Sequence, residues 1–249
     1  MGVQFRTPSN YSQLHAGGVW ELFRKDYPKL EEHEPLPQAL EVFGSILLGM
    51  PSFELLSGPR HDRFWFVAKN PDELIQFQNN RIHFNWRSRP EISRPYPRFD
   101  YVCSKFFDAF DILDAHLLKE FGEGIQVVQS EISYINHFPY LVGLDTKSIS
   151  DWVNIIDTEK FSSEDINLKM RHPLLRDGEP YARVNLEIAS ALKPPNDRIF
   201  VLTTTVRGCS VTVDKASLRE FFEEGSSIIV NNFNAITTEW AHSYWNRTE

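Results

Sequence analysis

Apolar residues recur at spacings of three and four in several stretches of the chain, which is the pattern of an amphipathic helix. Helices are predicted on this basis at residues 12–27, 98–121, 148–156 and 215–246. Pro28 ends the first of them, and Gly122 and Gly124 end the second. Asp214 is suited to cap the last helix, which we expect Gly225 to kink.

Shorter apolar runs, several with alternating polar residues, predict β-strands. They lie at residues 2–6, 40–50, 51–56, 62–69, 73–79, 81–87, 126–138, 164–171, 180–190 and 198–206, with 209–213 extending the last. The acidic, proline-bearing segment 31–37 is predicted to be a connector. Turn signals at Asn70-Pro71 and Asn79-Asn80 separate neighbouring runs, so we expect residues 40–87 to form an antiparallel meander.

The order of these elements predicts an α+β fold. It also repeats, because strand, helix, antiparallel meander and long helix occur once in residues 1–124 and again in residues 125–249. We therefore expect two similar halves, each with a long C-terminal helix packed on a curved antiparallel sheet. The first strands of the two halves are expected to pair into one continuous sheet. The alternative is one irregular α+β domain.

The composition is that of a folded chain with a full core. Of its 249 residues, 41% are hydrophobic and 13% aromatic, which excludes a disordered protein. Cys103 and Cys209 are too few for a disulfide framework and are interpreted as packing residues. The longest apolar run, residues 46–50, is far shorter than the ~18 residues needed to span a bilayer. Because the N-terminus has no signal-peptide pattern, we expect a cytoplasmic protein without membrane contact.

Motifs for known chemistries are missing from the sequence. It has no phosphate-binding loop, dinucleotide fingerprint, nucleophile elbow or metalloprotease motif. Its eight histidines lack metal-ligand spacing, so we expect no cofactor and no metal. Asp108, Asp111 and Asp114 share one face of a predicted helix, and paired carboxylates can perform acid–base chemistry. The favoured interpretation of these aspartates is a solvated face opposite the apolar one.

The predicted hairpin that turns at Asn79-Asn80 has one apolar and one polar face. The apolar face carries Ile75, Phe77, Ile82, Phe84 and Trp86. The polar face, called the polar stripe below, carries Gln76, Gln78, Arg81, His83, Asn85 and Arg87. The stripe is either the ordinary solvent face of an antiparallel sheet or a binding surface rich in amide and guanidinium groups.

Positive charge gathers in the same region. Residues 81–98 contain five arginines and one acid, so this stretch carries +4 while the whole chain carries −8, which leaves −12 for the rest. A basic segment in an acidic protein indicates an anionic partner. Trp86 and Tyr96 lie within it and Arg98 ends it, and such aromatic side chains can stack on bases or fill a partner's pocket.

Tyr134 and Asn136 form a second, weaker candidate. Strand alternation puts both side chains on one face, where they could line a groove together with the polar stripe. Buried hydrogen bonding between the halves is the alternative interpretation.

Residues 74–87, LIQFQNNRIHFNWR, and 96–99, YPRF, resemble the central block of a sporadically distributed family of uncharacterised bacterial proteins. The segments GVQF at residues 2–5 and SYINH at 133–137 are similar to other landmarks of that family. The resemblance implies an accessory or mobile-element gene, such as part of a defence or toxin–antitoxin pair. It implies no settled activity and no catalytic residues.

Three classes of function stay open. The favoured one is a non-enzymatic binding protein that holds a protein partner or an anionic small ligand through the polar stripe and the arginine-rich segment. The second is an enzyme with its site between the halves, where His83 is the acid or base and Arg87 and Tyr134 hold an anionic intermediate. The third is a nucleic-acid binder, against which the net charge of −8 argues.

Overall fold

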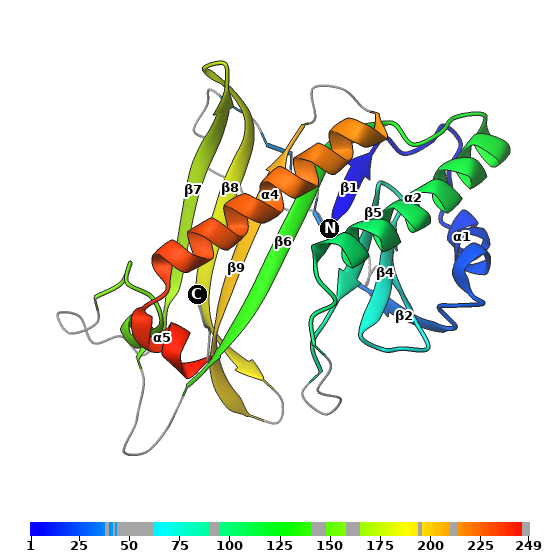
Figure 1. Ribbon diagram of the computed structural model, residues 1–249. Helices are drawn as coiled ribbons and strands as arrows, with labels where there is room; N and C mark the ends of the chain where they lie inside the picture. Colours follow the sequence, from blue (N-terminus) through cyan, green and yellow to red (C-terminus); the bar gives the residue numbers. More distant parts are fainter. Residues whose placement is uncertain are drawn as a thin grey trace, which may run out of the picture. The chain divides into compact units, whose positions relative to one another are not determined.

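The computed structural model describes residues 1–37, 40, 41, 43, 62–89, 95–140, 148–157, 165–193, 196–209 and 214–245. Within these ranges the chain is an α+β protein with nine strands and five helices (Figure 1). It divides into two compact units. The first comprises Met1–Glu131 and Gly208–Phe222, and the second comprises Ile132–Arg207 and Glu223–Glu249.

The first unit is built on an antiparallel sheet. Its strands are β1 (Gly2–Phe5), β2 (Lys29–His33), β3 (Arg63–Val67), β4 (Glu73–Gln78), β5 (Arg81–Trp86) and the beginning of β6 (Val127–Pro139). They are neighbours in the order β2-β3-β4-β5-β1-β6, and each neighbouring pair is antiparallel. Its helices are α1 (His15–Phe23), α2 (Phe99–Phe121) and the beginning of α4 (Lys215–Ile236).

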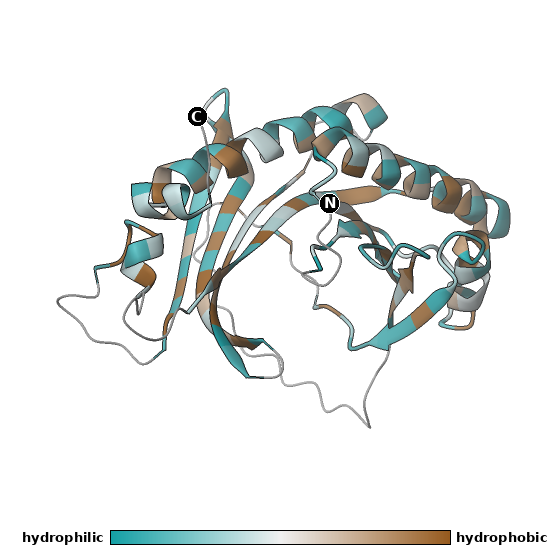
Figure 2. Cartoon of the chain, turned by 60° about the horizontal axis from the view of Figure 1, so that its bottom comes forward, coloured by the Kyte–Doolittle hydropathy of each residue, from teal (hydrophilic) through white to brown (hydrophobic). Residues whose placement is uncertain are grey.

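The second unit takes the rest of β6 and adds three long strands. These are β7 (Asn167–Arg176), β8 (Glu179–Lys193) and β9 (Asp197–Gly208), with the order β6-β9-β8-β7. Its helices are α3 (Ile149–Trp152), the rest of α4, and α5 (Glu239–Tyr244). In both units apolar and polar residues alternate along the strands, as Figure 2 shows by colour.

Most of the predicted elements within the described residues are confirmed. The strands and helices expected from alternation and helical periodicity are present, with ends shifted by a few residues. The β4–β5 hairpin has the predicted register, because Gln78 lies opposite Arg81 and Gln76 opposite His83. Gly122 ends α2 in the left-handed conformation that glycine favours. The runs predicted at residues 44–56 and 210–213 lie outside the described residues.

Two predictions about element ends were wrong. The segment predicted as a connector begins within β2, whose Glu31 lies opposite Trp65 in β3. The last helix is not continuous to residue 246, since α4 ends at Ile236 and α5 begins at Glu239. The break falls at Thr237 and Thr238 rather than at Gly225. Thr238 caps α5 by accepting a hydrogen bond from the main-chain N–H of Ala241.

The core of the first unit lies on one face of its sheet. Val3, Ile82 and Phe84 are fully buried there, and α2 packs against β5 with Phe106 and Leu113 also fully buried. Burying a side chain of this size is worth roughly 1.5–3 kcal/mol. The opposite face of the same strands carries the polar stripe.

The core of the second unit centres on Trp152, which is fully buried. Phe138 stacks on its indole with ring centres 5.4 Å apart, and Trp240 meets it edge-on at 4.8 Å. Leu186 and Leu202 belong to the same cluster. Because these residues come from β6, β8, β9, α3 and α5, the cluster joins the sheet of this unit to its helices.

Glycine at position 225 is required by packing against the sheet. A Cβ on Gly225 would lie 2.7 Å from Ile132 Cγ2 and 3.4 Å from Val206 Cβ. We expect Gly225→Ala to lower the free energy of unfolding by about 1–3 kcal/mol, because overpacking outweighs the better helix propensity of alanine. Urea denaturation measures this change.

The matched control is Gly17→Ala in α1, where nothing lies within 4 Å of the added methyl group. That variant is expected to gain up to about 1 kcal/mol of stability. A Gly225→Ala variant as stable as the wild type would contradict the close packing of α4 on β6 and β9.

Candidate functional site

Polar side chains form a row that crosses four neighbouring strands of the first unit. Gln78, Arg81, Gln4 and Gln129 lie opposite one another in register on β4, β5, β1 and β6. Each is at most 6% exposed. We call this set the glutamine–arginine row. Polar groups so deeply buried need hydrogen-bond partners to offset their desolvation.

The glutamine–arginine row holds main-chain groups of the chain's own residues 36, 37 and 41. The Gln78 amide accepts from the Leu36 N–H at 2.9 Å and donates to the Leu36 carbonyl at 3.2 Å. Arg81 donates to the Pro37 carbonyl at 3.0 Å and to Gln4 at 3.4 Å. The main-chain N–H of Glu41 donates to Gln129 at 2.7 Å. The bonds to residues 36, 37 and 41 are made to their main-chain groups and not to their side chains.

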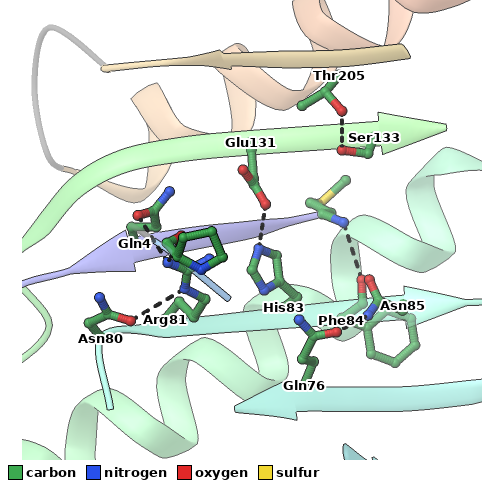
Figure 3. A network of polar contacts seen from close by, with 12 residues as sticks. Gln4, Gln76, Asn80, Arg81, His83, Phe84, Asn85, Glu131, Ser133 and Thr205 are labelled. Carbon is green, nitrogen blue, oxygen red and sulfur yellow. Dashed lines mark hydrogen bonds and ion pairs between the residues drawn. The ribbon is translucent and has the colours of Figure 1, made fainter. Parts of the chain in front are cut away.

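A second row lies one step along the strands and contains Gln76, His83, Gly2 and Glu131. His83 Nε2 and Glu131 Oε1 are 2.7 Å apart. Figure 3 marks this contact with a dashed line. The imidazole reaches β6 by lying over Gly2 in the intervening strand. A Cβ at Gly2 would lie only 2.0 Å from His83 Cδ2, so only glycine leaves room for this contact.

The environment of His83 favours a neutral imidazole. Burial lowers the pKa of His83, and the hydrogen bond to Glu131 opposes this only in part. With the Glu131 carboxylate as acceptor, Nε2 carries the proton and donates it. His83 Nδ1 is buried without a hydrogen-bond partner among the described residues. His83 is 6% exposed, and its Nε2 is engaged by Glu131.

The remaining polar-stripe residues are also engaged within the first unit. Asn85 donates to Gln76 at 3.4 Å. Arg87 donates from Nε to the Pro71 carbonyl at 3.0 Å, and its guanidinium lies 5.9 Å from the ring centre of Trp65. Four of the six polar-stripe residues are therefore buried, and Asn85 and Arg87 are half-buried.

The residues after the hairpin lie at the surface. Tyr96 is 43% exposed and its ring meets that of Trp86 edge-on at 5.3 Å. Glu73 lies opposite Trp86 in the β4–β5 register and accepts a hydrogen bond at 2.9 Å from the hydroxyl of Tyr101, which is 38% exposed. We call Trp86, Tyr96, Arg98 and Tyr101 the aromatic patch.

Arg98 lies between the two tyrosines in the sequence and has a backbone conformation that arginine rarely adopts. It is the residue before α2, and its φ of 72° with ψ of 164° lies in a region used almost only by glycine. Such a backbone costs about 1–3 kcal/mol. Its side chain is exposed and caps no helix end.

Tyr134 and Asn136 belong to the second unit, in the part of β6 beyond Glu131. The Tyr134 hydroxyl lies 2.8 Å from the Ser226 hydroxyl on α4, so it contacts the helix that packs on this strand. Asn136 is half-buried. A groove shared by these two residues and the polar stripe stays a prediction.

Sequence reasoning missed four residues that complete the two rows: Gly2, Gln4, Gln129 and Glu131. A signal was present, because each pair is spaced two residues apart in a predicted strand and so shares one face. It became informative only once β1 was known to lie between β5 and β6.

No protein-family model, no curated protein and no solved structure matches this chain. In the part of the chain that the structure describes, no group of three or more histidine, cysteine or acidic side chains could hold a metal ion. Among the same residues, no helix has the length and apolar character needed to cross a membrane.

The buried His83–Glu131 pair makes stability depend on pH. Because the folded pKa of His83 is lower than its usual 6.5, the unfolded chain binds the proton more readily. His83 therefore stabilises the fold fully above about pH 7, and this contribution falls as pH drops below 6.5. We expect the free energy of unfolding to decrease toward pH 5, with a slope of up to about 1.4 kcal/mol per pH unit from His83.

His83→Gln should remove this part of the slope while keeping a neutral polar side chain at the site. Urea denaturation of both proteins between pH 5 and pH 8 measures the difference. Equal slopes for wild type and variant would contradict burial of His83 as a neutral group.

Proposed function

We propose that this chain is a non-enzymatic binding protein of a bacterial accessory module, of the defence or toxin–antitoxin kind, and that it holds an acidic protein partner through the aromatic patch. The accessory role rests on the resemblance of residues 74–87 and 96–99 to the sporadically distributed family. Membership of that family is part of the proposal. So is the plan of two similar halves, 1–124 and 125–249, which rests on the repeated order of strand, helix and long helix.

The observation that carries the proposal is the strained backbone at Arg98. A glycine at this position would adopt the same conformation without the cost. Strained backbone conformations cluster at functional sites, where the function of the side chain outweighs the loss of stability. Arg98 is exposed at the start of α2, two residues after Tyr96 and three before Tyr101, so the strained backbone belongs to the same surface segment as the tyrosines of the patch.

The composition of the aromatic patch fits a protein interface. Tryptophan, tyrosine and arginine are the residues most enriched where binding energy is concentrated. Tyr96 and Tyr101 each expose more than a third of their surface while part of each ring contacts its own unit. Arg98 supplies a planar, bidentate donor that suits a carboxylate on the partner.

The polar stripe is less accessible to a partner than the sequence suggested. Gln76, Gln78, Arg81 and His83 are each at most 7% exposed. A partner that used Gln78 or Arg81 would have to displace Leu36 and Pro37 from their hydrogen bonds. The roles of these residues in partner binding, the enzyme hypothesis and the nucleic-acid hypothesis stay predictions.

Affinity capture from the native host tests the proposal. Tagged wild type is expected to retain a protein partner in stoichiometric amount, and both Tyr96→Ala and Arg98→Gly should reduce its recovery at least tenfold, the effect of losing an interface contact worth about 1.4 kcal/mol or more. Arg24→Ala is the matched control, since Arg24 is an exposed arginine directly after α1 that pairs with Glu21 in that helix.

The same Arg98→Gly variant separates binding from folding. Relief of the strained backbone should raise its free energy of unfolding by about 1–3 kcal/mol, while Arg98→Ala keeps the strain and gains nothing. A variant that is more stable yet fails to capture the partner has lost the contact and not the fold. Equal recovery of the partner by Arg98→Gly and by the wild type would contradict the proposal.

A further inference from the structure

Strand β7 forms the free edge of the sheet in the second unit. It is last in the strand order and pairs along its whole length with β8 (Figure 1). Eight of its ten residues are exposed. No other described strand bonds to its outer side. An edge of this kind presents main-chain N–H and C=O groups that another strand can pair with.

The register shows which main-chain groups of β7 point outward. The N–H of Ser190 donates to the carbonyl of Ile166 at 2.9 Å, so these two residues form a hydrogen-bonded pair. Bonded and non-bonded pairs alternate in an antiparallel ladder. The main-chain groups of Lys169 and Arg171 therefore point away from β8, and so does the nitrogen of Pro173.

Proline at position 173 limits the open part of the edge. It lacks an N–H at an outward position, where proline is tolerated because no ladder bond is lost. The pairing with β8 then shifts register between Leu174 and Leu175. The regular part of the edge that remains open for pairing runs from Asn167 to Arg171, which is long enough for a short extended peptide.

The charge along β7 indicates what could pair there. Its ten residues contain Lys169, Arg171 and Arg176 and no acid, in a chain of net charge −8. Lys169 is 3.0 Å from Glu187 in β8, while Arg171 has no ion-pair partner among the described residues. A second copy of this chain does not fit, because antiparallel pairing of two β7 strands would bring their lysine and arginine side chains together.

We propose that the outer edge of β7 is a docking strand for an extended acidic segment of a partner protein, which pairs with Lys169 and Arg171 by adding a strand to the sheet. Main-chain hydrogen bonds would supply affinity, and Arg171 would select for acidic side chains. This site lies in the second unit and does not depend on the aromatic patch. Basic and proline residues also protect edges from pairing, so the test must separate docking from protection.

The probe is a fluorescent seven-residue peptide of alternating valine and glutamate, with lysine in place of glutamate as the control peptide. Fluorescence polarisation at low salt is expected to show saturable binding of the acidic peptide and at least tenfold weaker binding of the lysine peptide. Arg171→Pro removes an outward N–H, as Pro173 already does, and should weaken acidic-peptide binding at least tenfold. Arg171→Glu should do the same through charge.

Each contrary result overturns the proposal. Absence of saturable acidic-peptide binding to the wild type would show a protected edge. Binding that Arg171→Glu weakens but Arg171→Pro leaves unchanged would show charge attraction without strand pairing. If Arg171→Pro does not fold, amide hydrogen exchange of the wild-type protein is the alternative test. Adding the acidic peptide is expected to slow exchange at the amides of Lys169 and Arg171. Unchanged exchange at both amides would overturn the proposal.

Discussion

Pairing of buried polar groups is the constraint on which the first unit depends. One face of its sheet buries amides, a guanidinium, an imidazole and a carboxylate, and each buried group without a partner costs about 1–3 kcal/mol. The glutamine–arginine row meets this requirement with main-chain groups of Leu36, Pro37 and Glu41. His83 meets it at Nε2 only, by crossing over Gly2 to Glu131. The row therefore holds residues 36, 37 and 41 on the sheet through four hydrogen bonds.

This use of the polar stripe changes where binding is expected. Gln78, Arg81 and Gln129 already bond main-chain groups of residues 36, 37 and 41, so they contribute to stability. Replacing them would disturb the local structure, and a loss of partner binding could not then be assigned to a lost contact. The aromatic patch is different, because it combines exposed tyrosines with an arginine held in a costly backbone conformation. The edge of β7 adds an independent basic surface in the second unit. Both surfaces carry basic side chains, which suit the acidic protein partner proposed above.

Local patterns in the sequence predicted much of the fold. Alternation and the Asn79-Asn80 turn set the β4–β5 register, because a short hairpin loop fixes which residues face each other. The same alternation placed Gln78 and Arg81 on one face. It could not show that this face is covered, since the covering residues lie about forty positions earlier in the chain and carry no local signal.

The two wrong element ends have similar causes. The acidic composition of residues 31–37 predicted a connector, yet Glu31 lies opposite Trp65 in β3, and this tertiary pairing makes residues 29–33 an edge strand. The apolar periodicity of residues 215–246 continues past Thr237, and it therefore predicts one continuous helix. The hydroxyl of Thr238, a good N-cap, was a signal that the periodicity concealed.

Amide hydrogen exchange at Leu36 and Glu41 tests most directly whether the glutamine–arginine row is an internal structure. If the row holds these residues, both amides exchange far more slowly than in an unstructured peptide, and Gln78→Ala releases Leu36 while Gln129→Ala releases Glu41. Free exchange of both amides in the wild type would contradict the account, because the polar stripe would then be an open surface and the first candidate for binding a partner.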